Sequence, residues 1–233
     1  ATALRWSRAC HCCFFCVCGD HRAHPCSPTR RSSDLGILID ADEMQAAFLE
    51  VFSATPPPDY SLHPFGHAAE HSWWRELVAA VLTHLGGQAA EFASPPRPPA
   101  FDSLFDSLYS HFSSSTAWSL YPDTVEFLES ASQLGPLAVV SNFDDRLAPI
   151  LDGLGIGPFF EHIFTSADAR SRKPDRALFD LALDRMNCAP AETAHCGDSL
   201  EADFHGATAA GLRAFHLVRP GHTLFDFLEF CTA

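Results

Sequence analysis

Residues 137–142, Leu-Ala-Val-Val-Ser-Asn, and residues 193–199, Thr-Ala-His-Cys-Gly-Asp-Ser, decide the fold of this chain. Each begins as a short apolar run of strand length and ends in polar side chains. Two more strands are expected, at 162–165 and 213–218. Helical patterns lie between them, and strands that alternate with helices predict a parallel sheet with right-handed crossovers. The second half of the chain is therefore predicted to be an α/β domain.

Helices are expected around these strands, at 122–134, 144–154, 174–186 and 200–210. Pro122 suits the first position of a helix, where the amide hydrogen that proline lacks has no partner.

The first half of the chain has a different pattern. Apolar residues recur at helical spacing over 41–52, 67–85 and 101–112, and proline or glycine clusters separate these stretches. Residues 36–115 are therefore predicted to be all helix and loop.

Composition limits the classes of function. The chain has 233 residues, 47% of them hydrophobic and 19% charged, which is typical of a globular protein. Its formal net charge of -14 argues against nucleic acid or an anionic membrane as a partner.

Charge and cysteine usage change near residue 35. Six of the nine cysteines lie in the first 26 residues. Residues 1–35 hold five arginines and two aspartates, which gives this segment a net charge of +3. Because the whole chain has a net charge of -14, the remaining residues carry -14 - 3 = -17. Cys188, Cys196 and Cys231 are predicted to be ordinary buried thiols, which favours a cytoplasmic protein.

Five polar residues near the strand ends suggest a chemistry. Ser141 and Asp198 each follow a strand, so both are expected to face one crevice at the carboxyl edge of the sheet. Ser141 and the backbone amide of Asn142 can donate to a phosphoryl oxygen, and Lys173 can offset its negative charge. Asp198 and Asp203 suit a hard cation such as Mg²⁺. Each motif alone is common in turns and helix caps, but their order and spacing together are specific.

This arrangement resembles motifs two to four of the haloacid dehalogenase-like hydrolases. The strings Trp-Ser-Leu-Tyr-Pro at 118–122 and Phe-Thr-Ser at 164–166 are similar too, and the resemblance covers about residues 36–218. It implies a Rossmann-like core with an inserted helical cap, Mg²⁺ dependence and, in active members, an aspartyl-phosphate intermediate.

The resemblance also implies roles for individual residues. Carried over by position, Ser141 and Lys173 are the catalytic residues, and with Asn142 they bind phosphate. Asp198 ligates the metal, with Asp203 in support.

The first motif of that family, a strand followed by Asp-x-Asp-x-Thr/Val, is imitated at residues 37–42, Ile-Leu-Ile-Asp-Ala-Asp. The spacing of Asp40 and Glu43 matches a capping box, and a helical pattern starts at once. Asp40 is therefore predicted to cap a helix rather than to act as a nucleophile.

The second imitation is the apolar run Cys12 to Cys18, followed by Gly19-Asp20. The residues that follow Asp20 include neither the second aspartate nor the threonine of the motif. The run is nevertheless the only segment suited to the central position of the sheet, between the strands that end at Ser141 and Cys196. Without it two strands would expose unpaired edges.

The cysteines and histidines of the N-terminal segment leave a third hypothesis open, a small zinc-binding module. Cys10, Cys13 and Cys16 are spaced three apart, whereas structural zinc sites usually combine two separated ligand pairs.

The sequence thus predicts an aberrant N-terminal segment (1–35), a helical cap (36–115) and a Rossmann-like core (116–233). The leading functional hypothesis is a phosphatase-type hydrolase that uses Mg²⁺ on a small phosphorylated molecule, but that lacks the nucleophile and is inactive or nearly so. The alternative is a non-catalytic pseudoenzyme that binds a phosphorylated ligand or a protein partner.

Residues 28–35, Pro-Thr-Arg-Arg-Ser-Ser-Asp-Leu, back-translate without strain as CCT-ACA-CGA-CGC-TCT-TCC-GAT-CT. This string resembles the end of a sequencing-library adapter, so we interpret residues 1–35 as an assembly artefact that replaced the first strand. Amplification of the transcript across the codons for residues 25–45 tests this. We expect no product that encodes residues 28–35, and a clean one would contradict the interpretation.

Overall fold

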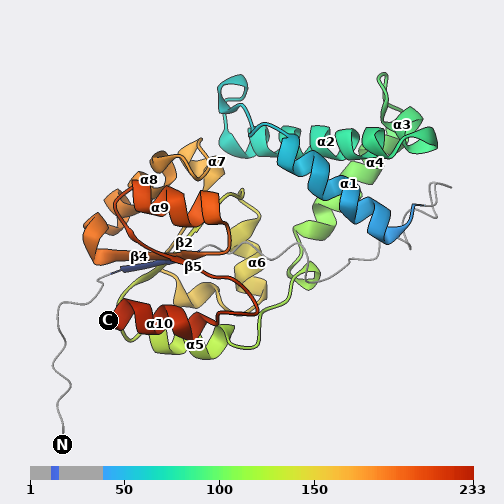
Figure 1. The fold of residues 1–233 in the computed structure, drawn as a ribbon. Coiled ribbons are helices and arrows are strands. Elements are labelled where there is room, and N and C mark those ends of the chain that lie inside the picture. The colour runs from blue at the N-terminus through green and yellow to red at the C-terminus, as the bar shows by residue number, and fades with distance from the viewer. Residues whose placement is uncertain (1–11, 16–38) are drawn as a thin grey trace, which may run out of the picture. The chain divides into compact units, whose positions relative to one another are not determined.

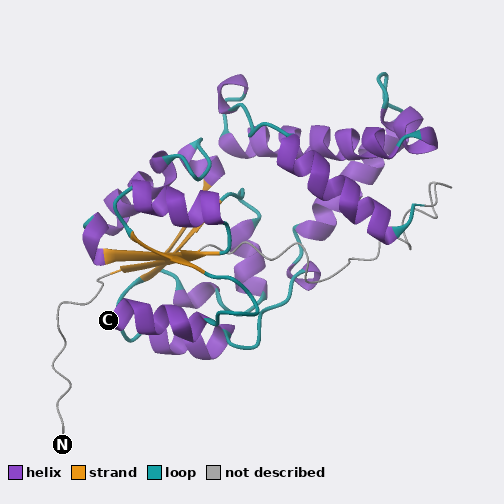
Figure 2. Ribbon diagram, viewed as in Figure 1, coloured by secondary structure: helices purple, strands orange, loops and turns teal. Residues whose placement is uncertain are grey.

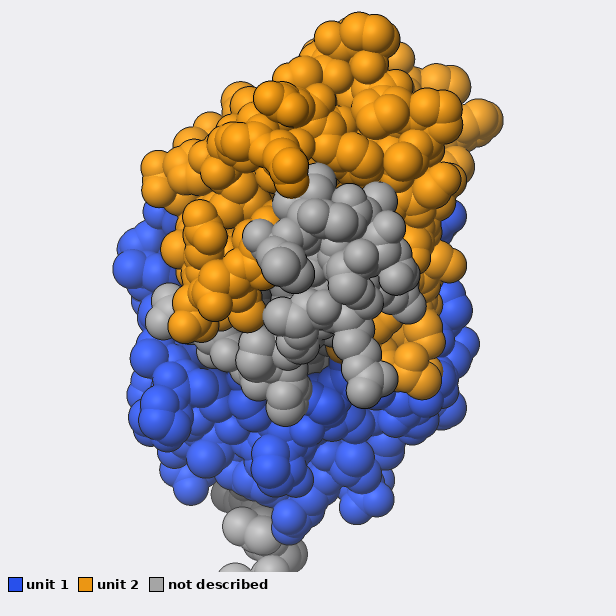
Figure 3. Space-filling model, turned by 90° about the vertical axis from the view of Figure 1, so that its right-hand side faces the viewer, with its two compact units in different colours: residues 1–19, 118–233 blue, residues 20–117 orange. Residues whose placement is uncertain are grey.

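The structure of the chain, a computed structural model, describes the backbone of residues 12–15 and the whole of residues 39–233. The described residues fall into two compact units (Figure 3). Residues 12–15 and 118–233 form the sheet unit, and residues 39–117 form the helical unit.

The sheet unit is built on a parallel sheet (Figure 2). Its strand order is β3-β2-β1-β4-β5, and every pairing in it is parallel. The strands are β1 Cys12–Phe15, β2 Leu137–Ser141, β3 His162–Thr165, β4 Thr193–Gly197 and β5 Arg213–His216. The predicted α/β, Rossmann-like parallel sheet is confirmed.

Strand β1 occupies the central position. Its Phe14 lies opposite Ala138 of β2 on one side and opposite His195 of β4 on the other. The prediction that the cysteine-rich run fills this position is confirmed for residues 12–15. Residues 16–18 lie outside the described residues.

Helices cover both faces of the sheet. Figure 1 shows α5 and α10 on one face and α8 and α9 on the other. The α-helices of the unit are α5 Thr124–Ala131, α6 Leu147–Gly153, α7 Ser166–Ala169, α8 Arg176–Met186, α9 Gly206–Ala209 and α10 Leu224–Thr232. Short 3-10 helices span Gly157–Phe159 and Pro190–Glu192, and a π-helix spans Leu200–His205.

The two faces of β2 contribute to two separate apolar cores, because successive side chains of a strand point in opposite directions. Leu137 and Val139 pack in a core formed with α5, α6 and α10. Ala138 and Val140 pack in the other core, with α8 and α9. Strand β2 is buried throughout, which explains its unbroken apolar sequence.

The helical unit contains four α-helices, α1 Ala41–Ala54, α2 Gly66–Leu85, α3 Gly87–Ala93 and α4 Pro99–Phe112, and two 3-10 helices, Tyr60–Leu62 and Ser115–Ala117. Trp73 and Trp74 of α2 pack against Phe52 of α1, and the indole nitrogen of Trp73 donates to the carbonyl of Pro56. These aromatic side chains join α1 to α2.

Asp40 caps α1, as predicted. Its carboxylate accepts hydrogen bonds from the amides of Asp42 at 2.9 Å and Glu43 at 3.2 Å, and its carbonyl accepts the first helical bond, from Met44. Asp40 is therefore committed to the helix terminus and does not end a strand of the sheet.

Two helices begin later than the sequence pattern predicts, because an aspartate near each predicted start is bound by an arginine side chain. Helix α5 begins at Thr124 rather than Pro122, since the carboxylate of Asp123 accepts hydrogen bonds from Arg219 and from the amide of Leu224. Helix α6 begins at Leu147 rather than Asp144, whose buried carboxylate pairs with Arg146.

Three helical segments differ from the prediction in kind. The helix expected over 200–210 is a π-helix followed by the short α9. Helix α3 begins at Gly87, the second residue of the glycine pair that was expected only to end α2, and α10 was not anticipated.

The prediction that all three late cysteines are buried thiols is wrong for one of them. Cys196 and Cys231 are free and buried, but Cys188 is only half-buried and is disulfide-bonded. Among the described residues, no helix combines the length and the apolarity needed to cross a membrane.

Candidate functional site

Ser141 lies at the carboxyl end of β2, where the predicted phosphate-binding group was expected. The residue is fully buried, yet its hydroxyl oxygen has no hydrogen-bond partner among the described residues. A buried polar group without a partner costs about 1–3 kcal/mol, so such groups are rare unless a ligand or water completes them. The hydroxyl of Ser141 is therefore available to an incoming group.

Lys173 places its ammonium group beside the same strand end. Its Nζ donates to the carbonyl oxygen of Val140, the residue before Ser141, at 2.7 Å. It also donates to Oδ1 of Asp203 at 2.6 Å, and both side chains are 1% exposed. A positive charge is thus fixed at the peptide that joins Val140 to Ser141.

Asn142 fixes the loop that carries Lys173. Its side-chain oxygen accepts from the backbone amide of Lys173 at 2.7 Å, and its side-chain nitrogen donates to the carbonyl of the same residue at 3.0 Å. The amide side chain is therefore used for positioning. The predicted contact of Asn142 with phosphate depends on its backbone amide, which lies next to Ser141 in the chain.

Asp203 is surrounded by donors. Oδ1 also lies 3.0 Å from Nε2 of the buried His195, and Oδ2 accepts from the amide of Ser199 at 3.0 Å. Burial alone would raise the pKa of Asp203, but the charge of Lys173 and the hydrogen bond from His195 outweigh it and hold that pKa well below its usual range. Since an ionised carboxylate only accepts, Nε2 of His195 carries the proton.

The π-helix brings Asp203 back over the end of β4. The amide of Phe204 bonds to the carbonyl of Ser199, five residues earlier, and the hydroxyl of Ser199 accepts from the amide of Ala202. A Cβ atom at Gly197 would lie 2.2 Å from the carboxyl carbon of Asp203, so only glycine fits there. A single π-turn of this kind is common at functional sites.

Asp198 lies between Gly197 and Ser199, at the carboxyl end of β4, and is exposed. Nowhere in residues 39–233 do three or more His, Cys, Asp or Glu side chains gather closely enough to hold a metal ion by themselves. Mg²⁺ needs fewer protein ligands, because it keeps several waters and binds one or two carboxylates together with a phosphate. One exposed carboxylate at the strand end therefore suits Mg²⁺, with Asp203 held nearby by Lys173.

His195 was not identified from the sequence as part of the site. The sequence feature that could have identified it is a large polar side chain within the buried strand β4, whose other residues are small. Its ring packs edge-on against Phe179 of α8 at 5.1 Å, which fixes the ring plane. His216, at the end of β5, was also missed.

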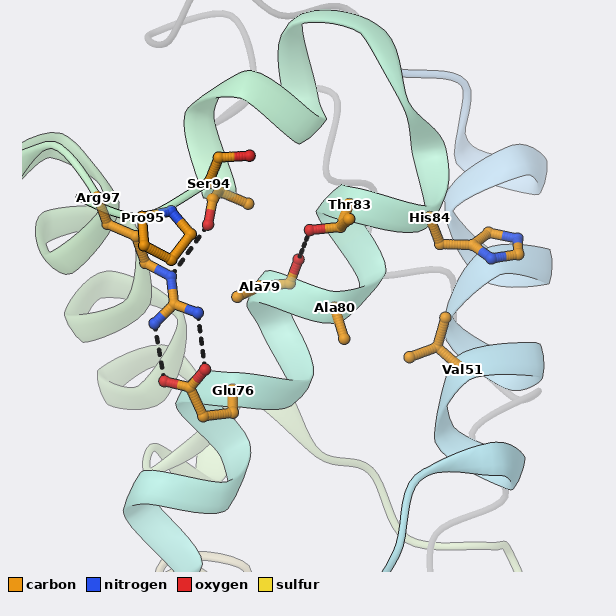
Figure 4. Close-up of a pocket in the computed structure, with 10 residues that line it drawn as sticks. Val51, Glu76, Ala79, Ala80, Thr83, His84, Ser94, Pro95 and Arg97 are labelled. Carbon is orange, nitrogen blue, oxygen red and sulfur yellow. Dashed lines mark hydrogen bonds and ion pairs between the residues drawn. The ribbon is translucent and has the colours of Figure 1, made fainter.

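A groove of about 520 Å³ in the helical unit is a separate feature (Figure 4). Several of its polar groups already have partners within the unit. Glu76 and Arg97 form a bidentate ion pair, and the hydroxyl of Thr83 donates to the carbonyl of Ala79. None of the predicted site residues lines this groove.

Comparison with known proteins agrees with this geometry. Residues 33–211 match the sequence model of the haloacid dehalogenase-like hydrolases. The chain belongs to this family. Haloacid dehalogenase-like hydrolase domain-containing protein 3 of Bos taurus is 34% identical over 189 residues, which cover 79% of this chain and 71% of that protein.

Two further proteins are similar at lower identity. A protein of Halopiger xanaduensis named ribulose-1,5-bisphosphate 5-phosphatase is 28% identical over 200 residues, 83% of this chain and 79% of its own length. The crystal structure of the hydrolase YfnB of Bacillus subtilis, described as bound to magnesium, has the same fold with a TM-score of 0.65, at 19% identity, over 90% of this chain and 89% of that one.

The buried ion pair gives a testable consequence for stability. Lys173→Met leaves the carboxylate of Asp203 buried without its cation, which typically costs about 3–5 kcal/mol. We expect a loss of that size in urea unfolding at neutral pH, and partial recovery in the double variant Lys173→Met/Asp203→Asn. Arg176→Met, which removes a cation from an exposed pair with Asp180, is the matched control and is expected to change little.

The free energy of unfolding, measured in the same urea experiment, is expected to decrease as the pH is lowered into the range where Asp203 becomes protonated. The pKa of Asp203 is lower in the folded chain than in the unfolded one, so its stabilisation is complete above the unfolded value of roughly 4 and is lost as the pH falls. Equal stability of Lys173→Met and the wild-type chain at pH 7 would contradict the arrangement of this pair.

Proposed function

We propose that the chain binds a small phosphorylated molecule at the carboxyl ends of β2 and β4, through the site that phosphatase-type hydrolases use. The observation that carries this proposal is the buried hydroxyl of Ser141, which has no hydrogen-bond partner among the described residues. The ammonium group of Lys173 is bonded to the carbonyl of the preceding residue, Val140. A phosphoryl oxygen supplies the acceptor that the hydroxyl of Ser141 lacks, and its negative charge is favoured by the ammonium group of Lys173.

Each residue has a defined part in this proposal. Ser141 and the amide of Asn142 donate to phosphoryl oxygens, and Lys173 balances their charge. Asp203 and His195 hold the ammonium group in place. Asp198 would hold Mg²⁺, which when bound neutralises charge on the phosphoryl group and helps to orient it.

Two of the comparisons support this reading. The Halopiger relative is named as a phosphatase, and the Bacillus structure is described as holding magnesium. At 19% identity, the likeness to the Bacillus structure shows a shared fold only. The binding of a metal by Asp198 is therefore part of the proposal.

We further infer that hydrolysis by this chain is absent or very slow. A covalent mechanism needs a nucleophilic aspartate at the end of the first strand and a second carboxylate as acid and base. Asp40 is committed to the N-terminus of α1. The other candidate, Asp20, lies outside the described residues and lacks the second aspartate of the motif. The chain then acts as a ligand-binding pseudoenzyme or as a hydrolase with little turnover, and a protein partner remains the alternative ligand.

Removal of the hydroxyl tests the binding site. Ser141→Ala is expected to weaken binding of inorganic phosphate by on the order of 10- to 100-fold, the usual effect of losing a hydrogen bond to a charged group. Titration calorimetry measures this change. Since the hydroxyl has no partner in the unliganded chain, the variant should lose no stability.

The matched control is Ser132→Ala, an exposed serine in the same unit that bonds to its own helix. It is expected to bind phosphate like the wild-type chain. Unchanged phosphate affinity in Ser141→Ala would exclude the proposed site.

Turnover tests the inferred lack of activity. With a generic aryl phosphate and Mg²⁺ we expect release of the aryl alcohol at a rate indistinguishable from that of Lys173→Met. Robust turnover that Asp20→Asn or Asp40→Asn abolishes would show that a nucleophile is present after all.

A further inference from the structure

The loop that carries Asp198 is anchored on three sides. The carbonyl of Gly197 accepts from the amide of Leu217 at 2.9 Å, which continues the pairing of β4 with β5. The amide of Ser199 donates to Asp203 at 3.0 Å. The third anchor is at Asp198 itself, where its carbonyl oxygen lies 3.0 Å from Nε2 of His216.

His216 reaches this carbonyl from the end of β5. It lies opposite Gly197 in the register of the two strands, so its side chain needs to span only one residue position. A backbone carbonyl can only accept, and therefore the Nε2 atom of His216 carries a hydrogen and donates it. The imidazole is half-buried, and the ring of Phe204 lies 6.4 Å from it. The imidazole of His216 is thus held by its position in β5 and has the ring of Phe204 as a neighbour.

This contact acts on the backbone and leaves the carboxylate exposed. Two of the three anchors hold the peptide that directly follows the Cα atom of Asp198, since His216 bonds to its carbonyl oxygen and its amide, which belongs to Ser199, bonds to Asp203. Without the bond from His216, the carbonyl end of that peptide can tilt about its anchored amide, and this tilt changes the direction of the side chain. The exposed carboxylate would then have to be ordered when a cation binds, at a cost in affinity.

We propose that His216 is a positioning residue that orients the carboxylate of Asp198 for a divalent cation. This rests on the proposed function, in which Asp198 holds that cation. Partners of metal ligands commonly contribute a factor of about 10 to 100 to metal affinity, and they act by fixing the direction of the ligand.

Direct binding of Mn²⁺, followed by the loss of the free-ion signal in electron paramagnetic resonance, measures the effect without any turnover. His216→Leu removes the donor and is expected to weaken Mn²⁺ binding by about 10- to 100-fold. His216→Gln keeps an N–H donor of similar reach and is expected to restore most of the affinity. His216→Asn keeps the amide but is too short to reach Asp198, so it should bind as weakly as His216→Leu.

Two controls separate this inference from the function on which it rests. His84→Leu removes a partly exposed histidine of the helical unit and should leave Mn²⁺ binding unchanged. Asp198→Asn should abolish binding. Thermal melts of all variants establish that each is folded, and His216→Asn replaces His216→Leu if the latter is not.

The outcomes are distinct. Weak binding in His216→Leu and His216→Asn with recovery in His216→Gln supports the proposal. Loss of binding in Asp198→Asn together with normal binding in His216→Leu and His216→Asn overturns it and leaves the proposed function intact. Normal binding in Asp198→Asn overturns both, because the cation would then lie elsewhere.

Discussion

The buried ion pair between Lys173 and Asp203 holds together the segments on which the rest of the site depends. Lys173 comes from the loop before α8, Asp203 from the π-helix after β4, and the carbonyl of Val140 joins the end of β2 to the same ammonium group. His195 adds β4. An ion pair this deeply buried is compensated only when its remaining donors and acceptors are also paired, and here the backbone and a histidine supply those partners. Ser141, beside this network, keeps an unpartnered hydroxyl, and that contrast distinguishes a ligand-binding position from a structural one.

Much of the sheet could be predicted from the sequence, because apolar runs of strand length bounded by polar residues determine parallel strands. The strand at 162–165 was predicted at its observed bounds, and β4 differs by one residue. The helix termini were predicted less well. Asp123 and Asp144 look like ordinary residues of a helical pattern, but long-range partners such as Arg219 or a near neighbour such as Arg146 recruit them. The π-helix over 200–205 has the same apolar pattern as an α-helix, and only the backbone bond from the amide of Phe204 to the carbonyl of Ser199, five residues earlier, reveals it.

The site was predicted in its residue types but not in its connections. Ser141, Lys173 and Asp203 meet near the carboxyl edge of the sheet, while His195 and His216 were missed because a histidine within a strand pattern has no periodicity that distinguishes a functional role. The central strand was anticipated from the need of β2 and β4 for a partner, and residues 12–15 take that place. Backbone pairing requires only an extended apolar run, whereas catalysis requires a particular aspartate. This difference explains how the sheet can be complete in a chain whose nucleophile motif is not evident in its sequence.

The central claim is that Ser141 and Lys173 form a phosphoryl-binding position. A crystal structure of the chain grown with tungstate, an unreactive tetrahedral oxyanion located by its anomalous scattering, tests this claim most directly. The account predicts one tungstate with an oxygen within hydrogen-bonding distance of the hydroxyl of Ser141 and another oxygen near the ammonium group of Lys173. Tungstate bound only elsewhere, with the hydroxyl of Ser141 bonded to a protein group, would contradict it.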